Sequence, residues 1–175
     1  MKPVVYRYGL YAALAIVVLS AVHFFFLFPV LSWTGAEVAG YLTMILSMIF
    51  VFMGIRHYRD HVNQGFLSFG QGLKTGVLIV LIPAVFFGLF DLFYTEVLNP
   101  KWADEYYGYH IQKIKETVPA DKVAARLQKL QEERDMFGNP IFQFLLMAAT
   151  VFVIGLIATI ISTLTLRRSR NSSAA

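Results

Sequence analysis

The chain has 175 residues, of which 57% are hydrophobic and 15% are charged, and its net charge is +4. Charged residues make up roughly 25% of a typical soluble domain, so this low share indicates that lipid is the solvent, and the length fits one compact unit. The absence of cysteine excludes disulfides, thiolate metal ligands and cysteine nucleophiles, and the basic residues form no patch of the kind that binds nucleic acid.

Four apolar runs predict four transmembrane helices, at residues 8–31, 38–55, 75–98 and 141–166. Each is close to the roughly 20 residues that cross a hydrocarbon core of about 30 Å. Lipid offers no hydrogen-bond partners to the backbone, so each run must be helical. The first run is longer than the apolar part of a signal peptide, and we expect it to be retained. We predict an all-α fold, a four-helix transmembrane bundle in a single domain over residues 1–168.

The placement of lysine and arginine predicts the orientation of the helices. The basic residues that flank the runs on one side are Lys2, Arg7, Arg56, Arg59, Lys74, Arg167, Arg168 and Arg170. The link at 32–37 carries none, and in segment 99–140 seven basic residues are balanced by seven acidic ones. Because cytoplasmic loops are enriched in lysine and arginine, both termini are predicted to be cytoplasmic. Residues 169–175 are predicted to form a disordered tail.

Segment 99–140 is predicted to be a helical hairpin on the outer side of the membrane. Asn99-Pro100 and Asn139-Pro140 each suggest an N-cap followed by proline at the first helical position. Pro119 separates the two arms, Asp121 can cap the second arm and Gly138 can end it. Each arm carries one apolar stripe at helical spacing: Tyr107, Ile111, Ile114 and Val118, then Val123, Leu127, Leu130 and Phe137. The two stripes can pack on each other, on the outer helix ends or on a partner.

Two motifs carry a resemblance to a known family. They are 54–60, Gly-Ile-Arg-His-Tyr-Arg-Asp, and 68–76, Ser-Phe-Gly-Gln-Gly-Leu-Lys-Thr-Gly, with Gly65 between them and Asn139-Pro140 before the last run. The chain thereby resembles, over essentially residues 1–168, the bacterial membrane family catalogued as domain of unknown function 4199. The resemblance implies a small multi-pass protein of the bacterial inner membrane. It implies no activity and supplies no catalytic residues.

Asp91 is the most costly residue of the predicted spans. A central Asp costs about 2.5–3.5 kcal/mol to insert, so it normally faces the helix bundle, a partner or water. His23 lies at a similar depth in the first run. We hypothesise that Asp91 and His23 face each other, directly or through Tyr94 or a water molecule. The pair can be a structural hydrogen bond or a site that senses protons or binds a ligand.

Other motifs have simpler interpretations. Arg56, Arg59 and Lys74 lie where they can contact lipid headgroups on the cytoplasmic side. His57 and His61 are four residues apart, but too few further ligands are near them, so we predict no metal site. Residues 70–75 lack the glycine directly before lysine that a phosphate loop needs, and we predict no cofactor.

Small residues at helical spacing predict close helix packing. Gly72 and Gly76 share one face of the third run, and Gly155 and Ala158 lie on the fourth. These faces, or the outer hairpin, can contact a protein partner or a second copy of the chain. Membrane lipid is the other expected partner, and nucleic acid is not expected.

For function, we expect no enzyme and no catalytic residues. The chain is predicted to be a non-catalytic accessory, scaffold or regulatory component that acts with a partner protein or envelope lipid. One alternative is a small oligomeric transporter or channel that uses Asp91 and His23. A second alternative is a membrane enzyme acting on a lipid-linked substrate, with Asp104 and Glu105 beside His110.

Overall fold

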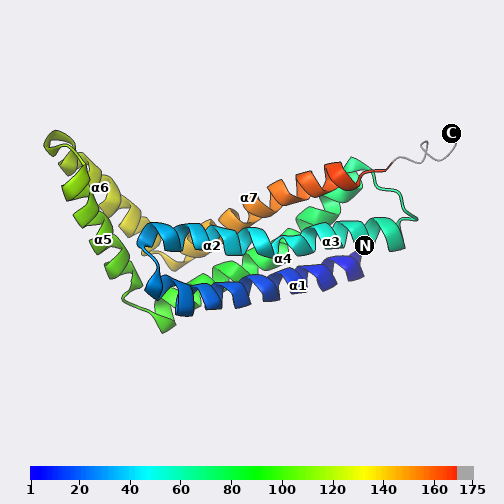
Figure 1. Cartoon of the computed structure of the whole chain (residues 1–175), viewed down its shortest axis with the longest axis horizontal. Helices are drawn as coiled ribbons and strands as arrows, with labels where there is room; N and C mark the ends of the chain where they lie inside the picture. Colours follow the sequence, from blue (N-terminus) through cyan, green and yellow to red (C-terminus); the bar gives the residue numbers. More distant parts are fainter. Residues whose placement is uncertain (169–175) are drawn as a thin grey trace. The chain divides into compact units, whose positions relative to one another are not determined.

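The structure is a computed structural model that describes residues 1–168 (Figure 1). The predicted disordered tail lies outside these residues. Between residues 1 and 168 the chain is helical and contains no strand, which confirms the predicted all-α class. The elements in chain order are α1 (Lys2–Val22), η1 (His23–Leu27), η2 (Phe28–Val30), α2 (Trp33–Ser47), α3 (Ile49–His57), η3 (Tyr58–Val62), α4 (Phe69–Phe93), η4 (Tyr94–Leu98), α5 (Trp102–Thr117), α6 (Ala120–Phe137) and α7 (Pro140–Leu166).

Four helical stretches of the described chain are long and apolar enough to cross a membrane, which confirms the four predicted helices. They are Lys2–Val30, Trp33–Val62, Phe69–Leu98 and Pro140–Leu166. All four begin before the predicted runs, because helix formation does not stop at the edge of an apolar stretch. The second stretch also extends past its run, through Arg56 and Arg59. Long basic side chains at helix ends can extend their charges toward water.

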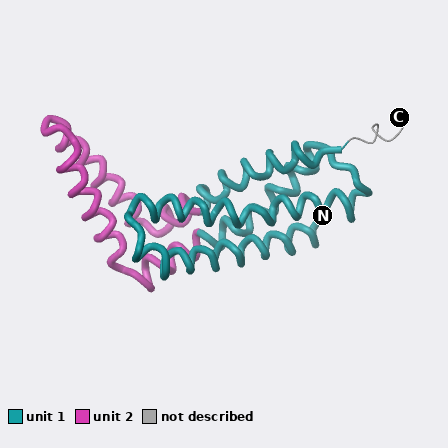
Figure 2. The backbone as a smooth tube through the Cα atoms, viewed as in Figure 1, with its two compact units in different colours: residues 1–87, 148–175 teal, residues 88–147 magenta. Residues whose placement is uncertain are grey.

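The contacts divide the chain into two compact units (Figure 2). Unit 1 comprises residues 1–87 and 148–175, and unit 2 comprises residues 88–147. The helices α4 and α7 therefore contribute one part to each unit. The predicted single domain stays a prediction.

Unit 1 is built from four helical stretches that pack along one another (Figure 1). Its core contains fully buried branched aliphatic side chains from each stretch: Ile16, Val51, Ile55, Ile79, Val80 and Val151. Met48 interrupts the second stretch between α2 and α3. At the residue before it, the hydroxyl of Ser47 donates to the carbonyl of Met44 at 2.7 Å, a local bond of the kind that bends helices. Large apolar side chains on the outside of the unit, such as Leu14 and Ile161, are more than half exposed.

Unit 2 contains α5 and α6, which contact each other. The residues of both apolar stripes are buried or half-buried, whereas the polar residues between them are mostly exposed. Arg134 of α6 donates to Asp104 of α5 at 2.5 Å, and its guanidinium lies 5.6 Å from the centre of the Tyr107 ring. Burial raises the pKa of Tyr107 to about 12. The contact between α5 and α6 and the partial burial of both stripes fit packing of the stripes on each other, and packing on the outer helix ends or on a partner stays open.

The predicted helix ends of this segment are partly right. Gly138 follows the last residue of α6, and the Asn139 side-chain oxygen accepts from the amides of Ile141 and Phe142, so these two predictions are confirmed. The N-cap predicted at Asn99 is wrong, because α5 begins at Trp102 and Asn99 belongs to the preceding turn. The cap predicted at Asp121 is also wrong. Pro119 precedes α6, and Asp121 lies inside its first turn.

Candidate intramembrane polar site

Three polar side chains of unit 2 form a hydrogen-bonded group where α4 and α7 meet. The side-chain amide of Gln143 donates to Asp91 Oδ2 at 2.7 Å and to Thr95 Oγ1 at 2.9 Å. Asp91 and Gln143 are both buried, with exposed fractions of 8% and 7%. We call Asp91, Thr95 and Gln143 the polar cluster. It joins the two helices that lead into and out of α5–α6.

Hydrogen bonds within one turn of the chain position Gln143 and Thr95 of the polar cluster. Asn139 and Pro140 start α7, and the carbonyl of Asn139 accepts from the amide of Gln143 one turn later. The Thr95 hydroxyl donates to the carbonyl of Asp91, four residues earlier, at 3.1 Å. Thr95 therefore bonds the backbone of Asp91, while Gln143 bonds the Asp91 carboxylate and the Thr95 hydroxyl.

Gly88 allows the two helices to approach closely enough for this bond. A Cβ atom at Gly88 would lie 2.8 Å from a ring carbon of Phe144 and 3.0 Å from the Phe144 carbonyl oxygen. Phe144 follows Gln143, and Gly88 precedes Asp91 by less than one helical turn. A side chain at Gly88 would therefore force apart the same helices that Gln143 bridges.

The bond between Gln143 and Asp91 has the length of a charge-assisted hydrogen bond. A buried carboxylate without a partner is costly, and a donor that is held in place offsets part of that cost. The cluster can therefore fix the register of α4 against α7. Titration of Asp91 would alter the same bond.

The other predicted members of the site lie in two different units. Tyr94 is buried at the first residue of η4, in unit 2. His23 is buried at the first residue of η1, in unit 1, and its ring lies against Phe24 and Phe28. The pairing of His23 with Asp91 stays a prediction.

Sequence reasoning missed Gln143 and Thr95 as partners of Asp91. Thr95 follows Asp91 by four residues, so it lies on the same helix face, which is a readable signal. Gln143 is the polar residue in the first turn of the fourth apolar run. A polar side chain within an apolar span is costly unless it has a hydrogen-bond partner, and this cost was the signal in the sequence. Only the packing of α7 on α4 shows that the two signals belong together.

Two of the predicted headgroup contacts are arginines engaged within the protein. Arg59 donates to both oxygens of Asp60, at 2.6 and 3.1 Å, and to the last carbonyl of α7, that of Leu166, at 3.3 Å. Arg56 lies 3.7 Å from Asp60. Lys74 is exposed. Contact of these residues with lipid headgroups stays a prediction.

The three glycines among the predicted small residues lie on the contact between α4 and α7 in unit 1. A Cβ atom at Gly72 would lie 2.5 Å from Thr163, and one at Gly76 would overlap Thr159. Gly155 is packed in the same way against Val80, while the carbonyl of Ala158 accepts from the Ser162 hydroxyl. The two helices thus approach closely at three glycines.

The rings of His57 and His61 stack, with centroids 4.4 Å apart. Among residues 1–168, no three or more His, Cys, Asp or Glu side chains are grouped in a way that could hold a metal ion. In segment 99–140, Asp104 is bonded to Arg134 and the ring of His110 lies 4.3 Å from that of Tyr106.

The family described as "Protein of unknown function (DUF4199)" matches residues 7–168, so the chain belongs to this family. No curated protein and no solved structure matches the chain. The predicted family is thereby confirmed. The match assigns no activity.

Proposed function

We propose that this family member is a multi-pass protein of the bacterial inner membrane, with both termini in the cytoplasm. Its four long helices form a transmembrane bundle, and α5 and α6 form a hairpin on the outer side. In this proposal the protein is a non-catalytic accessory, scaffold or regulatory component that acts with a partner protein or envelope lipid. The outer hairpin is the part that a protein partner meets.

The observation that carries this proposal is the bond between Gln143 and Asp91. It ties α4 to α7 at the base of α5–α6, and the Arg134–Asp104 pair ties α5 to α6. The costly carboxylate of the spans is thus used to hold helices together. Such a rigid base suits a protein that binds a partner through α5 and α6, because helices that are already ordered lose little conformational entropy on binding.

The positions of the helix ends that carry lysine and arginine support the proposed orientation. The ring of Tyr8, near the start of α1, lies 5.6 Å from that of His57, near the end of α3. Arg59 contacts the last carbonyl of α7, and Leu67, just before α4, pairs with Arg168 just after α7. The basic helix ends of unit 1 therefore gather at one end, as the preference of lysine and arginine for the cytoplasm requires.

Site-specific photo-crosslinking in living cells tests the proposed role. A photoreactive amino acid at Lys129, exposed on α6, is expected to give one discrete protein adduct that persists in the Asp91→Asn variant. The same amino acid at Ile157, exposed on the apolar surface of α7, is the control and is expected to give lipid adducts only. An absence of discrete adducts along the exposed positions of α5 and α6 would overturn the role in protein contact.

A small oligomeric transporter or channel is the second candidate function. It is favoured by two buried polar atoms of α1 and η1, Ser20 Oγ and His23 Nδ1, which have no hydrogen-bond partner among the described residues. Buried polar atoms of this kind call for water, an ion or a proton-linked role. Solute or proton flux into proteoliposomes that is lost in both His23→Ala and Asp91→Asn would establish this function in place of the first.

An enzyme acting on lipid-linked substrate has weaker support. It would need Asp104 free to act beside His110, and Asp104 is paired with Arg134. We therefore propose no catalytic residues.

A further inference from the structure

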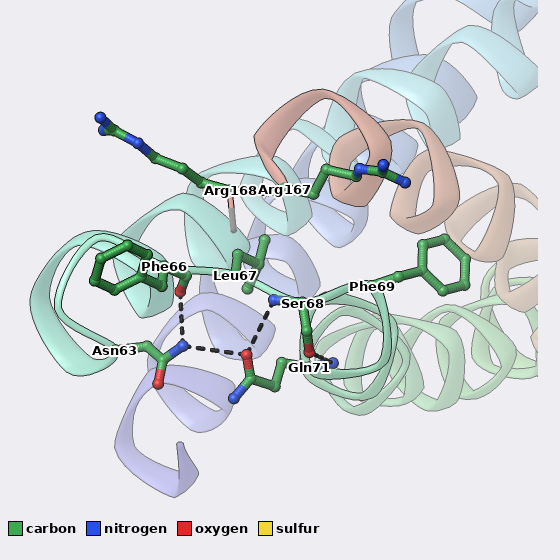
Figure 3. A pocket seen from close by; sticks show the side chains of 8 residues that line it. All are labelled: Asn63, Phe66, Leu67, Ser68, Phe69, Gln71, Arg167 and Arg168. Carbon is green, nitrogen blue, oxygen red and sulfur yellow. Dashed lines mark hydrogen bonds between the residues drawn. The ribbon is translucent and has the colours of Figure 1, made fainter. Parts of the chain in front are cut away.

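A pocket of about 540 Å³ lies at the end of unit 1 where α7 ends and α4 begins (Figure 3). Its polar lining comes from Asn63, Ser68, Gln71, Arg167 and Arg168, and its apolar lining from two phenylalanines and a leucine. None of the described residues that line it is acidic. We propose that this pocket binds the phosphate headgroup of an anionic phospholipid.

The walls of the pocket are held by a hydrogen-bond network. Asn63 donates to the carbonyl of Phe66 at 2.6 Å and to Gln71 Oε1 at 3.1 Å, as Figure 3 shows. Gln71 Oε1 also accepts from the Ser68 amide at 3.0 Å, while the Gln71 amide donates to the Ser68 hydroxyl at 3.3 Å. This reciprocal arrangement is a capping box, which satisfies amides at the start of α4.

The loop that precedes α4 is fastened to the end of α7. The backbone of Leu67 exchanges two hydrogen bonds with Arg168, of 3.1 and 3.0 Å, and Leu67 is 1% exposed. Gln64 and Gly65 make the turn into this loop with positive φ angles of 55° and 81°. These bonds hold the loop that supplies part of the pocket's lining against the end of α7.

The electrostatics favour an anion. Arg167 and Arg168 are exposed, and neither makes an ion pair with another described residue. Their side chains extend to opposite sides of Leu67 (Figure 3), so one guanidinium group must turn toward the other before both can hold a single phosphate. Guanidinium groups bind phosphate oxygens in pairs of parallel hydrogen bonds.

The apolar part of the lining distinguishes a lipid from free phosphate. Phe69 is 43% exposed beside the pocket, and Phe66 is half-buried. An acyl or glycerol group can cover these rings, whereas inorganic phosphate cannot. The pocket also lies at the basic end of unit 1, where the proposed orientation places the anionic cytoplasmic leaflet.

Lipid binding in this pocket rests on the part of the proposed function in which the protein acts with envelope lipid. It adds the class of lipid, an anionic phospholipid, and the place where its headgroup binds. The test is a titration of the purified full-length protein in neutral detergent with dioctanoyl phosphatidylglycerol, read by native mass spectrometry. Dioctanoyl phosphatidylcholine, which has the same tails without net charge, and glycerol phosphate, which has the charge without tails, are the two comparison ligands. We expect only phosphatidylglycerol to bind in the low-concentration range.

Two double variants locate the site. R167Q/R168Q removes two charges from the pocket, and K2Q/R7Q removes two exposed charges from the same end outside it. We expect the first to weaken phosphatidylglycerol binding about 30-fold and the second by less than about threefold. Circular dichroism and gel filtration confirm that both variants are folded.

Equal loss in the two double variants would overturn the pocket in favour of diffuse charge attraction. Equal binding of glycerol phosphate and phosphatidylglycerol would overturn the lipid as the ligand in favour of free phosphate. Either result leaves the crosslinking test of the outer hairpin untouched, so the two proposals fail separately.

Discussion

A double-mutant cycle on Asp91 and Gln143 tests the bond that holds the base of α5–α6. Asp91→Ala alone has two opposing effects, because it removes the bond and also removes a carboxylate that is costly in lipid. The single-variant stability is therefore a poor measure of the bond. The coupling energy of Asp91→Ala with Gln143→Ala isolates the interaction.

The structure sets the magnitude of this coupling energy. In soluble proteins, hydrogen bonds to charged groups contribute about 1.5–3 kcal/mol. Interhelical hydrogen bonds in a bilayer average about 0.6 kcal/mol and reach about 1.7, because separated helices find other partners in the membrane. The short distance of 2.7 Å and the burial of both groups favour the upper part of the membrane range. We expect about 1–1.7 kcal/mol.

Reversible unfolding in mixed micelles of dodecylmaltoside and dodecyl sulfate gives the four stabilities of the cycle. Asp91→Asn is the matched control, since its side-chain oxygen still accepts from Gln143, and its coupling to Gln143→Ala should stay measurable. A second cycle pairs Asp91→Ala with His23→Ala and tests the interaction expected from the sequence. A coupling energy below about 0.3 kcal/mol for Asp91 and Gln143, within the usual error of additivity, would refute the reasoning.

Three further perturbations have definite expected outcomes. Gly76→Ala should destabilise unit 1 by about 1–3 kcal/mol in the same unfolding assay, because the added methyl group overlaps Thr159. Gly70→Ala is the control, because Gly70 has open space around it, and it should change stability by less than about 0.5 kcal/mol. Asn139→Ala removes the cap of α7 and should cost about 1 kcal/mol, and an unchanged midpoint would contradict the cap. The folded state holds the phenol proton of Tyr107 more tightly than the unfolded chain does, because the pKa of tyrosine in an unfolded chain is about 10. The contribution of Tyr107 to stability should therefore be constant below pH 10 and should fall as the pH rises from about 10 to 12. Unfolding curves of the parent chain and Tyr107→Phe across that range measure the difference, and identical pH dependence would contradict the buried phenol.

The sequence predicted the helical class well, because apolar length alone decides which stretches can cross a bilayer. It also located the start of α7, since Asn139-Pro140 combines a side-chain cap with a proline where no amide is needed. The same dipeptide at Asn99-Pro100 misled, because there it makes a turn and α5 begins two residues later. The two occurrences of the motif differ because the chain around them packs differently, and the local sequence carries no information about that packing.

The partner of Asp91 shows a second limit of sequence reasoning. Asp91 could be identified from its cost in lipid, but its partner depends on which helix faces it and in which register. Depth suggested His23, a pairing that stays a prediction, whereas the close approach of α7 at Gly88 brings Gln143 to hydrogen-bonding distance of Asp91, which depth alone did not indicate. The capping box of Ser68 and Gln71 was readable from the sequence, and it explains why the start of α4 forms a wall of the pocket.

Cysteine accessibility tests most directly whether the four helices span the membrane with α5 and α6 on the outer side. The chain has no cysteine, so Val62→Cys, after α3, and Lys122→Cys, in α6, each give a single labelling site, and both parent residues are exposed. In intact spheroplasts, a membrane-impermeant maleimide is predicted to label the cysteine at 122 and to reach the cysteine at 62 only after lysis. Labelling of both positions before lysis, or of neither, would contradict the account.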